Sequence, residues 1–194
     1  MRVTALAGLV ALTLGVLAQG AAGAPKAACP SAWAHGWQKL ANKVDAPVYC
    51  PTWMPNPLDA QIGGQYEDIY SIGKDRSYLV SFLEHGDLGS GDVHVNFRGY
   101  PGRTTIPKCP GPVGKTTIPC FADPAGHMRA NGMRATVYQV NQGADQWHIL
   151  LAWRRDGSLY TVSQHVINPY DSVTTVRQNL LHLLKSLAVV QPAG

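Results

Sequence analysis

The spacing of apolar side chains predicts one helix near the start of the chain and another at its end. Trp33 and Trp37 recur at helical intervals within Ser31–Val44. In the final segment, Ser172–Leu187, the apolar residues share one side of a helix, with Asp171 as the expected N-cap: Val173, Val176, Leu180, Leu183, Leu184 and Leu187. So wide an apolar stripe must pack against a partner.

Between these helices, alternation of apolar and polar residues predicts strands. The strands expected are Tyr66–Ile72, Ser77–His85, Val93–Arg98, Met133–Val140, Gln146–Arg154 and Ser158–Ile167. Asn131-Gly132 and Asp156-Gly157 have the composition of two-residue hairpin turns. We therefore expect an α+β fold, in which a curved antiparallel sheet of about six strands carries the C-terminal helix on one face, beside a short N-terminal helix.

Residues 1–24 have the pattern of a secretory signal peptide. Arg2 precedes an apolar run from Val3 to Ala18, and a small-residue stretch, Gln19–Ala24, follows. The run of about 16 apolar residues is short for the roughly 20 that span a bilayer, which favours cleavage over anchoring. We expect a single secreted domain over 25–194, with no membrane span after cleavage. Lys26 stands where a lipoprotein leader needs an aliphatic residue, so lipidation is not expected.

Four cysteines in an exported chain predict two disulfides. Three pairings are possible, and proximity along the chain favours Cys29–Cys50 with Cys109–Cys120. No C-x-x-C spacing supports a zinc–thiolate site as the alternative. The proline-rich stretch Val48–Asp59 is expected to follow an irregular path, stapled through Cys50.

No local motif for catalysis or cofactor binding is present. Cys109-Pro-Gly-Pro-Val-Gly114-Lys115-Thr116 lacks the first glycine of a P-loop, and Ile118-Pro119-Cys120 follows it in place of a helix. The repeated Thr-Thr-Ile-Pro at 104–107 and 116–119 favours a disulfide-closed lobe. Neither G-x-S-x-G nor H-E-x-x-H occurs. We assign no catalytic residue and no cofactor; a secreted hydrolase with a site assembled from distant residues is an alternative.

The formal charge of +4 is mild, but basic residues concentrate in one stretch of the chain. Within residues 98–134 a single acidic residue, Asp123, accompanies six cations: Arg98, Arg103, Lys108, Lys115, Arg129 and Arg134. Folded onto one face, these six would bind an anionic envelope polymer or lipid headgroups; otherwise they form a solvated loop region. No aromatic residues are interleaved for base stacking, so nucleic acid is not expected as a partner.

Two histidines are predicted to face one another across a hairpin. If Asp156-Gly157 is a two-residue turn, His148 lies directly opposite His165, and cross-strand Cβ atoms are about 4.5–5.5 Å apart. Imidazoles this close could share a divalent metal, respond to mildly acidic pH, or simply be neighbours on a wet face. His94, on the polar side of another strand, is the candidate third ligand.

The final hairpin and helix also resemble a known class of domain. The stretch from Trp147 to Tyr160, with the closing helix, is similar over about residues 130–190 to small bacterial extracytoplasmic domains of unknown function. These occur in lipoproteins and on the outer side of anti-sigma factors. The resemblance implies a secreted or cell-envelope domain for binding or sensing. An alternative is a carrier of a small apolar ligand in a cavity between helix and sheet, lined by Trp147, Ile149 and Tyr160.

Overall fold

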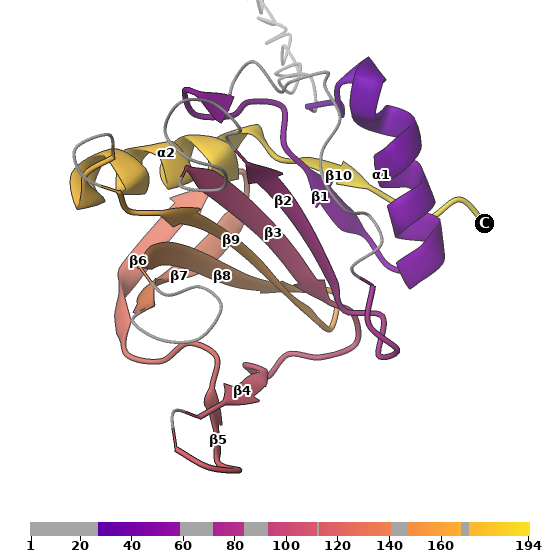
Figure 1. The fold of residues 1–194 in the computed structure, drawn as a ribbon. Helices are drawn as coiled ribbons and strands as arrows, with labels where there is room; N and C mark the ends of the chain where they lie inside the picture. Colours follow the sequence, from indigo (N-terminus) through magenta and orange to yellow (C-terminus); the bar gives the residue numbers. More distant parts are fainter. Residues whose placement is uncertain (1–26, 59–71, 84–92, 112, 141–146, 168–170) are drawn as a thin grey trace, which may run out of the picture.

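The computed structural model describes residues 27–58, 72–83, 93–111, 113–140, 147–167 and 171–194. The expected leader, 1–24, lies outside them, as does all but the last residue of the predicted strand Tyr66–Ile72. A curved, six-stranded antiparallel sheet with the order β2-β3-β9-β8-β7-β6 forms the centre of the fold, and two helices accompany it (Figure 1). The predicted α+β fold is confirmed.

The strands of this sheet lie within about two residues of the predicted bounds wherever a strand was expected. They are β2 Tyr78–Leu83, β3 His94–Tyr100, β6 Pro124–Ala130, β7 Met133–Val140, β8 His148–Arg155 and β9 Ser158–His165. Both hairpin turns are the predicted dipeptides, Asn131-Gly132 and Asp156-Gly157. All four of their residues have left-handed φ angles of 49° to 72°, as two-residue turns of type I′ require.

Helix α1, Ser31–Val44, has the predicted bounds and buries its aromatic side. Trp33 contacts Phe82 with ring centroids 5.1 Å apart, and Trp37 meets Phe97 edge-on at 6.2 Å. The helix ends at Asp45, whose left-handed backbone directs its N–H to the carbonyl of Ala41. The aromatic stripe therefore anchors α1 over β2 and β3.

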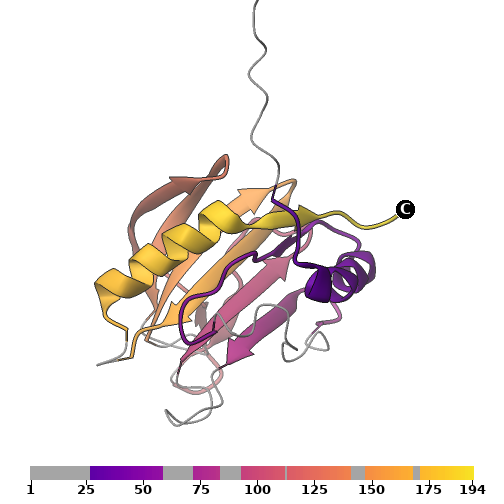
Figure 2. The same ribbon diagram turned by 90° about the horizontal axis from the view of Figure 1, so that it is seen from above.

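Helix α2, Val173–Ser186, runs across the sheet (Figure 2) and buries Leu180 and Leu183 fully, as expected. The predicted N-cap was wrong: Ser172, not Asp171, accepts a hydrogen bond from the N–H of Thr175 at 3.2 Å. Asp171 is buried instead, and Gln164 Nε2 donates to its carboxylate at 2.7 Å. Burial raises the pKa of Asp171.

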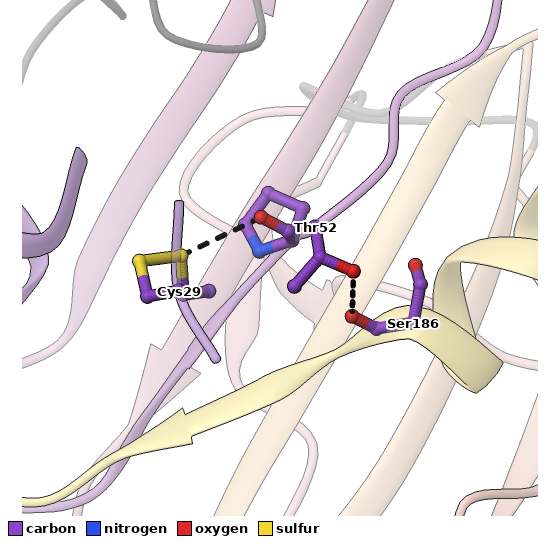
Figure 3. Close-up of a disulfide and its surroundings, with 5 residues drawn as sticks. Cys29, Thr52 and Ser186 are labelled. Carbon is purple, nitrogen blue, oxygen red and sulfur yellow. Dashed lines mark hydrogen bonds between the residues drawn. A yellow bond between two sulfur atoms is a disulfide. The ribbon is translucent and has the colours of Figure 1, made fainter. Parts of the chain in front are cut away.

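Two short strands that were not predicted join the first and last parts of the chain. β1, Val48–Cys50, pairs with β10, Ala188–Val190, in antiparallel register. Beside this ribbon the disulfide Cys29–Cys50 has the favoured pairing, and the hydroxyl of Thr52 donates to the carbonyl of Ser186 at 2.7 Å (Figure 3). The proline-rich stretch is thus fixed to the end of α2.

The second disulfide, Cys109–Cys120, closes the predicted lobe. Within it, β4, Lys108–Pro110, pairs with β5, Thr117–Pro119. The lobe leads into Phe121, which packs with Tyr138 and other residues in a small core of its own. Both favoured cysteine pairings are therefore present.

Alternation divides the side chains of the large sheet between two faces. The apolar face carries Phe97, Leu151 and Val162, and belongs to one core with the buried sides of α1 and α2. The polar face carries the intervening residues of the central strands: His94, Asn96, Arg98, His148, Thr161, Ser163 and His165. Leu150 and Leu159 lie farther along this face, in the small core under the lobe.

Candidate functional site

Three histidines lie side by side at one end of the polar face. The predicted opposition of His148 and His165 is confirmed by the β8–β9 register. On the other side of β9, Val95 pairs with Gln164, so His94 occupies the next position opposite His165. Three neighbouring strands each contribute one imidazole, and we call these residues the histidine row.

The rings of the histidine row are in close contact. Ring centroids are 4.6 Å apart for His94 and His148, 4.9 Å for His94 and His165, and 5.1 Å for His148 and His165. The Nε2 atoms of His94 and His148 are separated by 2.8 Å. One of these two nitrogens therefore carries a hydrogen and donates it, and the other has none and accepts it. The two rings cannot both be imidazolium ions while this bond exists.

The surroundings of the histidine row are polar and bury His148, while His94 and His165 are half-buried. His148 is 4% exposed, and Asn96 and Ser163 on the adjoining positions of the polar face are also buried. The hydroxyl of Ser81 donates to Asn96 Oδ1 at 2.7 Å. A charge on the buried ring of His148 would be costly unless an anion or an acceptor accompanied it.

Trp147 directly precedes the row and differs from its neighbours in exposure and in backbone conformation. Its side chain is 63% exposed, and its φ of 65° is left-handed, which is uncommon for a bulky residue. Its N–H donates to Val140 and its carbonyl accepts from Val166, at 2.9 and 2.8 Å. Backbone pairing thus holds an aromatic ring at the surface next to His148.

The residues expected to line an apolar cavity do not meet in one. Trp147 and Ile149 border a hollow of about 200 Å³ that also touches Val173 at the start of α2. Tyr160 is instead packed in the core against Tyr49, with its hydroxyl donating to the carbonyl of Pro47 at 2.9 Å. Burial raises the pKa of Tyr160 to about 12.

The predicted basic residues belong to several elements. Lys108 and Lys115 are exposed on the β4–β5 lobe. Arg129 and Arg134 are opposite one another at the β6–β7 hairpin. Arg98 is half-buried on β3, and Arg103 follows that strand.

Arg103 is already engaged in an ion pair. Its guanidinium lies 3.1 Å from the carboxylate of Asp75, in the turn before β2. The anion-binding surface suggested by the spacing of the six cations therefore stays a prediction, with Arg103 paired to Asp75.

In the structure, the histidine row contains a hydrogen bond between His94 and His148. Among the described residues, no three His, Cys, Asp or Glu side chains already have the arrangement that holds a metal ion. Two nitrogens on one tetrahedral zinc, at about 2.0–2.1 Å from it, are about 3.3 Å apart. The 2.8 Å between the Nε2 atoms of His94 and His148 is shorter than this by roughly half an ångström.

Comparisons of this chain with protein-family models, with curated proteins and with solved structures found no match to any of them. Within the part of the chain that the structure describes, no helix is long and apolar enough to cross a membrane. The side chains gathered on the polar face are thus the basis for assigning a function.

Proposed function

We propose that this chain is an extracytoplasmic binding domain whose histidine row binds a divalent transition metal ion. The observation that carries the proposal is the meeting of three imidazoles, from three neighbouring strands, with ring centroids no more than 5.1 Å apart. Neutral imidazole suits zinc, copper and nickel, and three protein nitrogens with one open position form a common zinc ligand set.

The scaffold supports such a role because each ligand stands on a paired strand, and strands place side chains more reproducibly than loops do. For the pair His94 and His148 the change needed on binding is small. The Nε2 atoms of His94 and His148, 2.8 Å apart, would separate by roughly half an ångström as the metal replaces the shared hydrogen. Rotations about the side-chain bonds supply this shift while the backbone register is kept.

The extracytoplasmic location is part of the proposal. Its supports are the leader-like residues 1–24, the two disulfides, and the resemblance of the final hairpin and helix to bacterial extracytoplasmic domains. Disulfides are compatible with such a location because oxidising compartments preserve them. A domain that binds a metal outside the cytoplasm would act as a carrier or a sensor of that metal.

Calorimetric titration of tag-free protein with Zn²⁺ and Cu²⁺ tests the metal site. We expect binding tighter than about millimolar. The double variant His94→Gln/His165→Gln should abolish it, as should His148→Ala. A matched double variant, His35→Gln/His127→Gln, removes two exposed histidines outside the row and should bind as the wild type does.

Thermal melts show whether each variant remains folded, which matters because His148 is buried. The folded double variant at His94 and His165, both half-buried, then decides the outcome. Binding weaker than millimolar in the wild type, or equal affinity in the two double variants, would exclude the metal site.

A further inference from the structure

A second candidate site lies at the other end of β8, on the opposite side of the sheet. A hollow of about 620 Å³ opens where the end of α2, the β6–β7 turn and the start of the β8–β9 turn come together. Residues from these elements and from β1 line it, among them Tyr49, Asn131, Met133, Arg155, Lys185 and Leu187. Figure 2 shows the β6–β7 hairpin beside the C-terminal end of α2. We call this the cationic hollow.

The charged groups that line the cationic hollow are both positive. Arg155 comes from the end of β8 and Lys185 from the last turn of α2, and the described residues that line the hollow include no Asp or Glu. Arg155 has one acidic neighbour: its Nε is 3.7 Å from Asp156, and both side chains are more than half exposed. Such surface pairs are weak, so Arg155 remains able to bind another anion.

Lys185 has a possible structural role at the end of α2, where cations favour the negative end of the helix dipole. The carbonyls there already have donors, however. Thr52 Oγ1 donates to Ser186 at 2.7 Å, and Asn131 Nδ2 donates to Leu187 at 2.9 Å. The ion pairs of the described residues include none to Lys185. Its ammonium group is therefore free to face a ligand.

The rest of the lining is uncharged and partly apolar. Exposed Ala27 and half-buried Val189 supply accessible apolar surface, whereas Met133 and Leu187 are almost fully buried. The phenol of Tyr49 is neutral at pH 7 like any tyrosine, and burial raises its pKa further. A ligand that fits this lining has an acid group for the two cations and an apolar body for the remaining wall.

We propose that the cationic hollow binds a small organic anion, a carboxylate or phosphate ester, with its acid group between Arg155 and Lys185. The volume lies within the range of about 300–1,000 Å³ typical of small-molecule sites. Guanidinium groups bind such acid groups through two parallel hydrogen bonds. His148 and Arg155 are at opposite ends of β8, about 23 Å apart along the strand, so this site is independent of the metal proposal.

Titration with octanoate, octyl phosphate and octylammonium, followed by amide NMR shifts, tests the proposal. The first two probes share an apolar chain and differ in the acid group, so their relative affinities identify the preferred one. We expect both anions to shift the amides of Gly132 and Leu187, with affinity falling as salt is raised. Octylammonium, which has the same chain with opposite charge, should leave these amides unshifted.

Two double variants with equal loss of charge locate the site. Arg155→Gln/Lys185→Gln should weaken binding of the better anion by about tenfold or more, because each lost bond involves a charged group. Lys108→Gln/Lys115→Gln removes two exposed cations from the β4–β5 lobe and should change the affinity by less than about twofold. All four side chains are exposed, so both variants are expected to fold.

Three results would overturn the assignment. The first is equal binding of octylammonium and octanoate, which would mean that only apolar surface is recognised. The second is equal affinity in the two double variants. The third is no shift at Gly132 or Leu187 with either anion up to about 10 mM, well above the concentrations at which specific small-molecule sites fill.

Discussion

The two faces of the large sheet are built from the same strands and both bury side chains, yet they carry different chemistry. On β9, Val162 lies in the apolar core while its neighbour Ser163, on the polar face, is equally inaccessible to solvent. On β8, Leu151 belongs to the apolar face and His148 to the histidine row. Burial alone therefore does not separate the faces; the kind of group that is buried does.

This difference has an energetic meaning. Burying apolar side chains stabilises the fold by about 25 cal/mol for each Å² removed from water, whereas a buried polar group destabilises it unless a hydrogen bond compensates. The hydroxyl of Thr161, on the polar face, has no partner among the described residues. Unpaired buried polar atoms are not confined to this face, because Gln164 Oε1 on the apolar side also has no partner among the described residues. The apolar face is the main source of stability because most of the buried hydrophobic residues belong to its core.

Adjacent leucines on β8 give the most direct comparison and the largest expected effect. Leu151 lies on the apolar face in the main core, and Leu150 lies on the polar face in the small core with Phe121. Substitution of either by Ala should destabilise the protein by about 2–5 kcal/mol, with Leu151→Ala nearer the upper limit because its larger core has less freedom to collapse. Urea denaturation measures both. A greater loss for Leu150→Ala would reverse the proposed division between the faces.

The two disulfides extend the comparison to the segments that cover each face. Their sequence separations, 21 and 11 residues, correspond to similar loop entropies of about 3 kcal/mol each. Cys50 is buried in the main core, so Cys29→Ala/Cys50→Ala should lower global stability by about that amount. Cys109→Ala/Cys120→Ala should mainly loosen the exposed lobe. Hydrogen exchange that increases throughout the sheet in the second variant would contradict this local effect.

The smallest expected effect concerns Asp171, which contacts the apolar side of the sheet through Gln164. Its pKa is raised, so the folded state favours the protonated form, and stability falls as pH rises past the ordinary value of 3.8. Asp171→Asn removes that loss and offers a donor to Gln164 Oε1, which has no partner among the described residues. We expect the variant to be more stable by about 0.5–1.5 kcal/mol at pH 7.

Melting curves at pH 3 and pH 7 check this assignment. The advantage of Asp171→Asn should shrink at pH 3, where the wild-type carboxyl is itself protonated. A variant that is less stable than the wild type at pH 7 would show that the charged carboxylate is needed in the fold.

The sequence was sufficient to predict the structure wherever neighbouring residues determine it. Asp156-Gly157 permits one tight turn, and counting outward from it places His148 against His165. The place of His94, the third residue of the histidine row, was harder to predict. Alternation puts His94 on the polar side of its strand but does not say that β3 pairs with β9. A sheet order of this kind depends on tertiary packing.

Where competing local choices were open, tertiary contacts decided them. Asp171 and Ser172 are both good N-cap residues, and Asp171 lost that position because Gln164 engages its carboxylate. The basic residues are close in sequence, but Arg103 turns away to Asp75. The cationic hollow was missed for the same reason, since Arg155 and Lys185 are brought together only by the docking of α2.

The pairing of β1 with β10 has a consequence for the order in which the protein can form. Val48 finds its strand partner, Val190, only after every strand of the large sheet and α2 have been synthesised. Gln38 and Asn42 of α1 likewise wait for hydrogen-bond partners at Gln191 and Ala193. A chain that emerges N-terminus first therefore cannot complete this layer until β10 and the residues after it have been synthesised, and a variant cut before β10 would lack the layer.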